Sequence, residues 1–485
     1  MTAGKEEDQK GITVKKNENF SDWYTEVIIK SGFMDYSPVS GMIVFRPDAY
    51  FVWEEIYKAV DARFKKNGVQ NTYFPLLIPE RLLKKEEKHV EHFKAEVGWV
   101  THGGDTKLEE RLAIRPTSET LMYEVMSKWI RSWRDLPMKL NQWNNVVRWE
   151  FKHPTPFLRT REFLWNEGHS AYETEEEALR ERDLILGIYE SALKDLLALP
   201  CIVGRKTEQE KFAGGVASYS MEMLMPDGKA VQGPIWHFDG QNFAKAFEMS
   251  FLDKDGNKAY VWQSTYAIAT RVLGVMVAMH GDDKGLVIPP SVSRIQIVIV
   301  PIYRNENRDL VMSKAKEMRE TLGRKFRVHL DDRDDRSPGR KYNEWELKGV
   351  PIRLEIGERD ISAGKVVAVR RDTAGKSDVP MAEIEGALKA LLKNMNKDLY
   401  SKAQSFMKGM VSESSDYAEM KDILQKRMGV VCAPWCGSED CENKMKDETG
   451  AKIINMSLGK KVRKGAKCVY CGKDARHMAN FAKSY

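Results

Sequence analysis

A highly charged hairpin in the first half of the chain limits the folds that the sequence can adopt. The segment VVRWEFKHPTPFLRTREF, residues 146–163, places four lysines and arginines and two glutamates among aromatic residues. Strand-like patterns over 139–151 and 161–168 flank a proline-containing turn at 153–157. This arrangement predicts two antiparallel strands, and therefore a sheet in which the chain folds back on itself.

The two strands together predict a surface of arginines, carboxylates and aromatic rings. Side chains alternate along a strand, so Arg148 and Glu150 share one face. The residues that share a face on the returning strand are Arg161, Phe163, Trp165 and Glu167. The turn supplies the further cations Lys152, His153 and Arg159. Arginine binds phosphate oxygens in pairs, so the hairpin is suited to a nucleotide. The alternative is a solvated hairpin whose charges pair with one another.

A single arginine, Arg271, interrupts the apolar stretch TYAIATRVLGVMVAMHG. The stretch predicts a buried helix over 265–280. A buried arginine must meet an anion, because an unpaired charge in the interior is costly. That anion is either a phosphate of a ligand or a carboxylate from elsewhere in the chain.

The chain is long enough for several domains. Its 485 residues exceed what one hydrophobic core supports. The composition of 280–293 predicts a linker, and beyond it strands and helices alternate as in an α/β domain. We expect a disordered lead-in over 1–18, a first domain over 19–287, an α/β domain over 295–398 and a C-terminal unit over 400–485. The net charge of +6 permits a nucleic-acid partner without requiring one. The N-terminal residues predict no signal peptide, and no apolar run predicts a membrane span.

Hydrophobic periodicity predicts individual elements before the linker. A helix follows the strand GMIVF, with Asp48 expected as its cap and Gly68 at its end. A strand interrupted by Pro75 comes next. The remaining elements are helices over 117–133 and 174–197 and strands over 229–238, 245–251 and 259–264.

Five of the six cysteines lie between Cys432 and Cys471. Two close pairs in this region, Cys436 with Cys441 and Cys468 with Cys471, predict a closed tetrahedral zinc site in a reducing compartment. From spacing alone Cys432 could replace Cys441, because Cys436 precedes a glycine as in a metal knuckle. Free thiols are the alternative.

Taken in order, these segments resemble the motifs of class II aminoacyl-tRNA synthetases. The helix after GMIVF with the strand around Pro75 resembles motif 1, VRWE with RTREF resembles motif 2, and ATRVLG resembles motif 3. Longer blocks resemble prolyl-tRNA synthetases of the archaeal and eukaryotic type, namely RPTSET, GRKTEQEKFAGG, GQNFAKAFE, HGDDKGLVIPP and SPGRKYNEWELKGVPIRLEIG. The resemblance runs from about residue 20 to Tyr485. It implies an α+β fold with a class II antiparallel-sheet catalytic domain, an α/β anticodon-binding domain and a small zinc-binding α+β domain.

The resemblance implies an ATP-dependent ligase that forms prolyl-adenylate and transfers the prolyl group to tRNA(Pro). It further implies a cytoplasmic homodimer without a membrane partner, ATP and Mg²⁺ as cofactors, and structural Zn²⁺. The residues that it implies are catalytic are Arg148 and Arg271. Those implied for ATP are Arg148, Glu150, Phe151, Arg159, Thr160, Gln232, Thr270 and Arg271. Those implied for proline are Thr117, Glu119, Arg148, Phe163, Trp165 and His237. Those implied for the anticodon are Asp332, Arg333, Arg336, Lys341 and Glu355, although DDRDDR is alternatively a solvated charge run. Those implied for zinc are Cys436, Cys441, Cys468 and Cys471.

The sequence departs from the family pattern on the substrate side. QGPIWHFDGQ places Ile235 and Trp236 before His237 and puts Asp239 where the family has leucine. Ala267 stands where the family usually has a glycine, and Ala269 stands where a hydroxyl residue is common. The segment FAGGVASYS lacks the acid and the tyrosine that usually follow the glycines. These departures keep open an alternative, a synthetase-like paralogue that binds tRNA or an amino acid without efficient charging. The segment between motifs 2 and 3 is too short for a separate editing domain, which predicts activation of alanine and cysteine.

Overall fold

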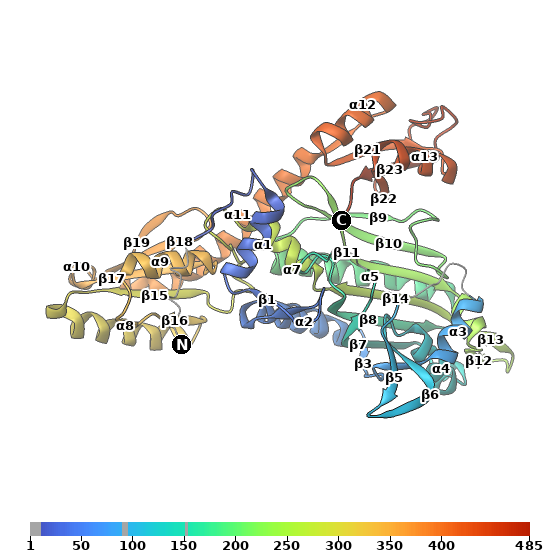
Figure 1. The fold of residues 1–485 in the computed structure, drawn as a ribbon, viewed down its shortest axis with the longest axis horizontal. Helices are drawn as coiled ribbons and strands as arrows, with labels where there is room; N and C mark the ends of the chain where they lie inside the picture. The colour runs from blue at the N-terminus through green and yellow to red at the C-terminus, as the bar shows by residue number, and fades with distance from the viewer. Residues whose placement is uncertain (1–10, 90–95, 151–153) are drawn as a thin grey trace.

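A mainly antiparallel sheet forms the centre of the molecule (Figure 1). The computed structural model describes residues 11–89, 96–150 and 154–485. Within this part of the chain the sheet has eleven strands in the order β20-β21-β23-β22-β9-β10-β11-β14-β8-β7-β3. Their bounds in that order are Val411–Glu413, Val430–Trp435, His477–Ala482, Lys452–Ser457, Ile202–Arg205, Ala217–Leu224, Ala230–Gly240, Trp262–Ala269, Glu162–Tyr172, Met138–Val147 and Gln70–Asn71.

The predicted hairpin is confirmed as β7 and β8. The two strands pair antiparallel, with Val146 opposite Phe163 and Asn144 opposite Trp165. The strand β7 ends at Val147 and not at residue 151 as predicted, because the backbone forms a turn at Trp149 and Glu150. The predicted cations Lys152 and His153 lie outside the described residues.

Three helices cover one face of the sheet: α2 (Pro47–Lys66), α5 (Glu175–Ser191) and α7 (Arg271–His280). The largest core cluster lies between these helices and the strands, where Tyr266 of β14 packs edge-on against Phe64 of α2. Side chains alternate along β14, so Thr265, Ala267 and Ala269 project from the opposite face. That second face is the one available for a site.

Several sequence predictions in this domain are wrong in detail. Residues 265–269 belong to β14, not to a helix, because a strand buried on both faces is as uniformly apolar as a buried helix. Residues 242–246 form a short helix, and only Ser250–Leu252 is a strand in the predicted segment 245–251. Asp48 lies in the first turn of α2, and Arg46 occupies the cap position without a side-chain cap hydrogen bond.

Residues 11–18, predicted as part of a disordered lead-in, lie against the first helix and the linker. The Glu26 carboxylate accepts from the Thr13 backbone at 2.9 Å, and Lys16 Nζ donates to the Gly281 carbonyl at 2.7 Å. Ile12 and Val14 of the same segment also pack against the main core cluster.

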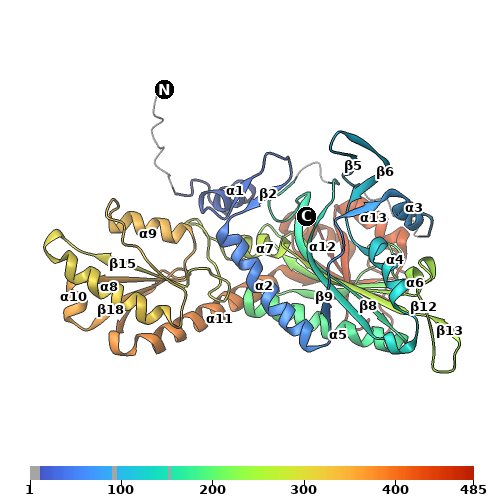
Figure 2. The same ribbon diagram turned by 90° about the horizontal axis from the view of Figure 1, so that it is seen from below.

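Short sheets and helices surround the central sheet. One small sheet pairs β1 (Met34–Tyr36) with β2 (Ile43–Phe45), and another pairs β12 (Ser250–Leu252) with β13 (Lys258–Tyr260). In a third, β6 (Thr106–Ile114) lies between β4 (Leu77–Pro79) and β5 (Trp99–Gly103). The short helices are α1 (Phe20–Lys30), α3 (Glu80–His89), α4 (Glu119–Trp129) and α6 (Asn242–Ala246). Figure 2 shows α4 and α6 together at the end of the sheet away from the second domain.

The second domain has a five-stranded sheet in the order β16-β15-β17-β18-β19. Its strands are Val328–Leu330, Ile297–Ile302, Ile352–Gly357, Lys365–Arg370 and Lys376–Pro380. β15 pairs in parallel with β16 and β17, as the predicted alternation of strand and helix requires. The helices of this domain are α8 (Arg308–Gly323), α9 (Pro338–Leu347), α10 (Glu358–Ser362) and α11 (Ile384–Met410).

The C-terminal unit is continuous with both other domains. The helix α11 spans the boundary predicted between 398 and 400, because one long amphipathic helix serves both units. β22 pairs with β9, so the C-terminal strands extend the central sheet. Its helices are α12 (Tyr417–Asp422) and α13 (Glu439–Thr449). The mixture of sheets and helices confirms the predicted α+β class. In the described part of the chain, no helix is both long and apolar enough to span a bilayer.

Candidate active site

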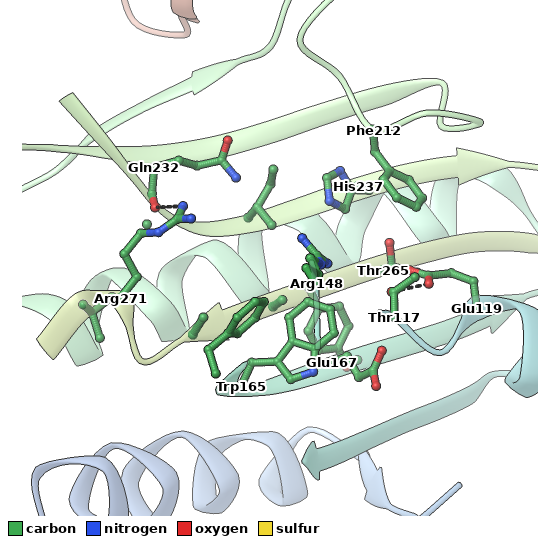
Figure 3. A pocket seen from close by; sticks show the side chains of 18 of the residues that line it. Thr117, Glu119, Arg148, Trp165, Glu167, Phe212, Gln232, His237, Thr265 and Arg271 are labelled. Carbon is green, nitrogen blue, oxygen red and sulfur yellow. Dashed lines mark hydrogen bonds between the residues drawn. The ribbon is translucent and has the colours of Figure 1, made fainter. Parts of the chain in front are cut away.

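A cavity of about 290 Å³ lies on the free face of the central sheet (Figure 3). Strands β8, β11 and β14, the start of α7 and the segment before α4 contribute its walls. The predicted site residues that line it are Thr117, Glu119, Arg148, Arg159, Thr160, Phe163, Trp165, Gln232, His237 and Arg271. Segments that are far apart in the sequence therefore meet in one place.

Arg148 lies over the two aromatic rings of β8. Its guanidinium carbon is 5.4 Å from the ring centroids of both Phe163 and Trp165, and its Nε donates to the Pro116 carbonyl at 3.0 Å. Among the described residues, no carboxylate forms an ion pair with it. The backbone contact and the rings hold the guanidinium in place while its charge stays available for an anion.

Arg271 begins α7 at the other end of the cavity. Its Nε donates to the Leu158 carbonyl at 2.9 Å and its Nη1 to the Gln232 carbonyl at 3.2 Å. Burial lowers the pKa of Arg271 to about 10, and the positive charges of Arg148 and Arg159 add to this effect. The side chain therefore remains a cation at neutral pH, in a cluster of cations that favours a polyanionic ligand.

The remaining residues predicted for a nucleotide have different positions. Glu150 is exposed and does not line the cavity, and Phe151 lies outside the described residues. Thr270 is buried before α7, and its hydroxyl makes no hydrogen bond. Arg161, expected on the same surface as Arg148, instead donates to the Ser40 carbonyl at 2.9 Å and stacks on Trp149.

Thr117 and Glu119 lie side by side at the opposite end of the cavity (Figure 3). The Thr117 hydroxyl donates to the Glu119 carboxylate, and both side chains are buried. Glu119 is the first residue of α4, where the helix dipole stabilises a negative charge. A carboxylate and a hydroxyl at this position suit a cationic amine.

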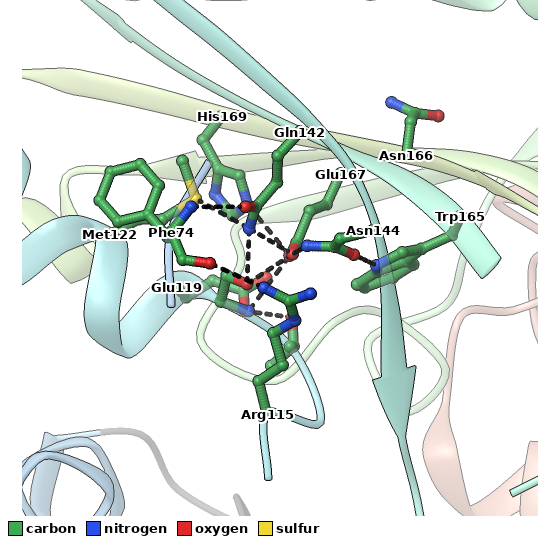
Figure 4. A network of polar contacts seen from close by, with 12 residues as sticks. Phe74, Arg115, Glu119, Met122, Gln142, Asn144, Trp165, Asn166, Glu167 and His169 are labelled. Atoms are coloured by element: carbon green, nitrogen blue, oxygen red, sulfur yellow. Dashed lines mark hydrogen bonds and ion pairs between the residues drawn. The ribbon is translucent and has the colours of Figure 1, made fainter. Parts of the chain in front are cut away.

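A network of hydrogen bonds centred on Glu167 fixes this end of the cavity (Figure 4). Glu167 Oε1 accepts from Gln142 and Asn144, each at 2.7 Å. Trp165 Nε1 in turn donates to Asn144 at 2.6 Å. Burial alone would raise the pKa of Glu167, but hydrogen bonding and charge from His169, together with hydrogen bonds from Ser118 and Asn144, lower it below its ordinary value. The orientation of Trp165 is therefore set by buried polar contacts.

His237 faces the cavity from β11. Its Nδ1 lies 2.7 Å from the Ser218 hydroxyl, and its ring packs on Phe212 with centroids 4.7 Å apart. Burial lowers the pKa of His237 to about 3, and the charges of Lys206 and Arg148 contribute. The imidazole is neutral at physiological pH, which suits packing or hydrogen bonding in the site and not proton transfer near pH 7.

Sequence reasoning missed several residues that line the cavity. They are Glu167, Gly168, His169, Glu210, Lys211, Phe212 and Thr265. The position of Glu167 on the Arg148 face of the hairpin was a signal for its role. Thr265 was missed because its strand was predicted as a helix, which assigned it to the wrong face.

The cysteine cluster has the arrangement of a metal site. The sulfurs of Cys436, Cys441, Cys468 and Cys471 all lie within 4.8 Å of one another. Gly437 follows Cys436 with a φ of +88°, a conformation that favours glycine in a metal knuckle. Cys432 is buried in β21 and is not part of this group. Four thiolates in such a group fit tetrahedral Zn²⁺.

Most residues predicted for the anticodon form internal contacts in the second domain. Arg333 pairs with Asp331 at 2.6 Å and with Glu344 at 2.8 Å. Lys341 is buried and donates to the Asp331 carbonyl at 3.0 Å. Arg336 pairs with Glu344, and Glu355 pairs with Arg353 at 2.9 Å. Asp332 is exposed.

Family comparisons cover nearly all of the chain. Residues 93–280 match the class II tRNA synthetase core domain of the G, H, P, S and T enzymes, residues 296–391 match an anticodon-binding domain, and residues 417–485 match the C-terminal domain of prolyl-tRNA synthetase. These matches agree with the sheet, the second domain and the cysteine-bearing unit described above.

Individual relatives are similar over their full lengths. The chain is 47% identical to a proline--tRNA ligase of Alkaliphilus oremlandii, with 96% of each chain covered. It is 45% identical to one of Natranaerobius thermophilus with 100% of each covered, and 44% identical to one of Cenarchaeum symbiosum with 98% and 99% covered. This chain therefore belongs to the prolyl-tRNA synthetase family of class II aminoacyl-tRNA synthetases.

Proposed function

We propose that this protein activates proline with ATP and transfers the prolyl group to tRNA(Pro). The observation that carries the proposal is the meeting of Arg148 and Arg271 in one cavity. Neither guanidinium forms an ion pair with a carboxylate in the described part of the chain. Two oriented cations without internal anions are what a triphosphate and an attacking carboxylate require.

The first step joins proline to the α-phosphorus of ATP. A carboxylate oxygen of proline attacks that phosphorus, the bond to the bridging oxygen breaks, and pyrophosphate leaves. Arg148 would contact the α-phosphate and the attacking carboxylate, and Arg159 and Arg271 would contact the β- and γ-phosphates. ATP enters as its magnesium complex. The reaction needs positioning and charge stabilisation, and no side chain has to accept a proton.

The rest of the cavity would orient the two substrates. Thr117 and Glu119 would bind the secondary ammonium of proline, while Phe163, Trp165 and His237 enclose its ring. We assign the adenine and ribose to the end near Thr160 and Gln232, with Glu150, Phe151 and Thr270 as further candidates. The Glu167 network supports this arrangement by fixing the indole of Trp165.

In the second step, a terminal ribose hydroxyl of the tRNA attacks the prolyl carbonyl, and AMP leaves. We infer that the second domain binds the anticodon, with Asp332, Arg333 and Arg336 as the more accessible candidates. Lys341 and Glu355 would act through the contacts that hold this surface together. Unstacked bases are bound through their edges by such charged side chains.

A zinc ion held by Cys436, Cys441, Cys468 and Cys471 would stabilise the C-terminal unit. A closed four-thiolate site leaves no open position for substrate, so its role is structural. Its proposed contribution is to link the end of β21, the start of α13 and the loop before β23.

We propose that the protein works as a homodimer in the cytoplasm. Exposed apolar side chains near β1, β2 and α2 support this assembly, including Tyr36, Val44 and Tyr50, which are 60%, 47% and 46% exposed. An apolar surface of this kind is typical of a protein interface. Light scattering coupled to size-exclusion chromatography measures the assembly directly, and a mass of one chain would refute a stable dimer.

The proposed activity is tested by ATP–pyrophosphate exchange and by aminoacylation of tRNA(Pro). We expect exchange that depends on proline and exceeds exchange with larger or acidic amino acids, followed by formation of prolyl-tRNA. Exchange without subsequent aminoacylation would support activation only. The absence of exchange with every amino acid would refute the proposed function.

A further inference from the structure

A second buried carboxyl lies near Glu119, next to His237 and Thr265, which line the amino-acid end of the cavity. Asp239 of β11 is 0% exposed, and neither of its carboxyl oxygens has a hydrogen-bond partner. Burial raises the pKa of Asp239 well above its ordinary value, and the negative charge of Glu119 raises it further. An unpaired buried carboxyl is destabilising, so its presence at this position indicates a partner that enters with the ligand.

Unpaired polar groups surround Asp239 on the neighbouring strand. Thr265 lines the cavity, and its hydroxyl faces the Asp239 carboxyl. This contact opposes the rise in the pKa of Asp239, but it lacks the geometry of a full hydrogen bond. Gln263 is fully buried, and neither the oxygen nor the nitrogen of its amide has a partner. The two residues project from the same face of β14, two positions apart. Together with Asp239 they form a polar cluster that is unsatisfied in the free protein.

A bulge in β11 places Asp239 next to the amino-acid end of the cavity. In the pairing of β11 with β14, Phe238 lies opposite Ser264 and Gly240 lies opposite Gln263. Asp239, between Phe238 and Gly240, has no partner residue on β14 and therefore occupies a β-bulge. A bulge re-aims a side chain at the edge of a site. Figure 3 shows Thr265 beside Thr117 and Glu119, with His237 on the adjacent strand.

Proline itself leaves this cluster without a partner. Its secondary ammonium is the only donor on the molecule, and Thr117 and Glu119 already lie together to receive it. The remaining ring atoms are CH₂ groups, for which an apolar wall would be sufficient. The segment containing Phe212 and Gly215 closes the space above, since a β-carbon on Gly215 would lie 3.4 Å from Asp239 Oδ1.

We propose that Asp239, with Thr265 and Gln263, binds a hydrogen-bond donor on the ring of the substrate. The preferred substrate class is then a cyclic imino acid that carries a hydroxyl or amino group, in addition to or in place of proline. This inference rests on the proposed function, because it assumes that the cavity activates an imino acid. A site built to bind a substrate donor discriminates strongly against a substrate that lacks it.

The test measures kcat/KM in ATP–pyrophosphate exchange for a matched set of imino acids. The set contains proline, the 3- and 4-hydroxyprolines, the 4-aminoprolines and 4-methylproline, which has similar size but no donor. The wild-type protein should prefer at least one donor-bearing isomer over 4-methylproline by about tenfold or more. Asp239→Ala should remove that preference, and Asp239→Asn should retain more of it for hydroxyl than for amino substituents.

Two further variants separate binding from folding. Thr265→Val should lower the same ratio without removing the carboxyl. Asp378→Ala removes an exposed carboxylate in the second domain and should leave the ratio unchanged. Thermal unfolding of each variant shows whether a lost preference reflects a lost fold.

Each outcome decides the proposal. A wild-type protein that activates proline but prefers no donor-bearing analogue refutes the role of Asp239 and leaves the proposed function intact. Equal losses for all imino acids in Asp239→Ala also refute it, because the carboxyl would then serve the ring nitrogen that they share. A wild-type protein that activates no imino acid refutes both inferences.

Discussion

Lys206 and Glu222 form an ion pair of 2.8 Å in the interior of the central sheet. Their side chains are 1% and 3% exposed, and the ammonium also donates to the Ile454 carbonyl at 2.7 Å. Ile454 belongs to β22 of the C-terminal unit, and Lys206 and Glu222 belong to the catalytic domain. One buried charge pair therefore joins the two units.

Removal of one partner should strongly destabilise the protein. Lys206→Ala leaves Glu222 buried without its cation, which is expected to lower the free energy of unfolding by about 3–5 kcal/mol. Urea denaturation followed by fluorescence measures the loss. The double variant Lys206→Met, Glu222→Met should recover most of it, and a single variant as stable as the wild type would show that the pair contributes little.

Zinc should bind to the chain in a one-to-one ratio. Cys468→Ser removes one of the four grouped sulfurs, and we expect loss of the metal and a lower unfolding temperature for the C-terminal unit. Elemental analysis of protein purified without chelator measures the metal content. Cys432→Ala is the matched control, because Cys432 lies outside the group and should leave zinc bound. Zinc-free wild-type protein would rule out the site.

Burial of the Glu442 carboxyl should make stability depend on pH. The Thr207 hydroxyl donates to Glu442 at 2.8 Å, while the other carboxyl oxygen of Glu442 is buried without a partner. Burial raises the pKa of Glu442 from 4.5 to about 7. The folded protein therefore binds this proton more tightly than the unfolded chain, and the resulting stability is present in full below about pH 4.5 and is lost as pH rises through about 7.

Glu442→Gln should remove this dependence. The variant is expected to exceed the wild type in stability at pH 8.5 by about 2 kcal/mol or less, and to gain nothing at pH 4.5. Unfolding temperatures at the two pH values measure the difference. A gain of the same size at both would show that the effect does not arise from titration.

Alanine and cysteine should be activated and transferred to tRNA(Pro) at a measurable rate. A pocket that accepts proline cannot exclude these smaller side chains by size. The chain between β8 and β14 consists of α5, α6, β9 to β13 and short connections, which leaves no separate folded unit for hydrolysis. A deacylation assay with alanyl-tRNA(Pro) checks this, and rapid hydrolysis by this chain alone would contradict it.

The sequence predicted the hairpin, the α/β second domain and the cysteine group because each has a strong local pattern. Alternation identified β7 and β8, and paired thiols identified the four cysteines. The Glu167 network could not be predicted in the same way, since Gln142, Asn144 and Ser118 meet through strand register and a loop. The extension of the central sheet by β22 also depends on long-range pairing that leaves no local signal.

The helix predicted over 265–280 shows a physical limit of pattern analysis. A central strand buried on both faces and a buried helix have the same apolar composition, so periodicity could not separate β14 from α7. This error hid the position of Thr265. The unpaired state of Asp239 was equally invisible, because it depends on what surrounds the carboxyl in the folded protein.

Arginines from distant parts of the chain are proposed to bind a single triphosphate. The most direct test is proline-dependent ATP–pyrophosphate exchange in the variants Arg148→Ala and Arg161→Ala. Both arginines belong to the same hairpin, but only Arg148 lines the cavity. We predict a loss of about 10²–10³-fold in kcat for Arg148→Ala and a change of no more than about threefold for Arg161→Ala. Full exchange activity in Arg148→Ala, or equal losses in both variants, would contradict this account.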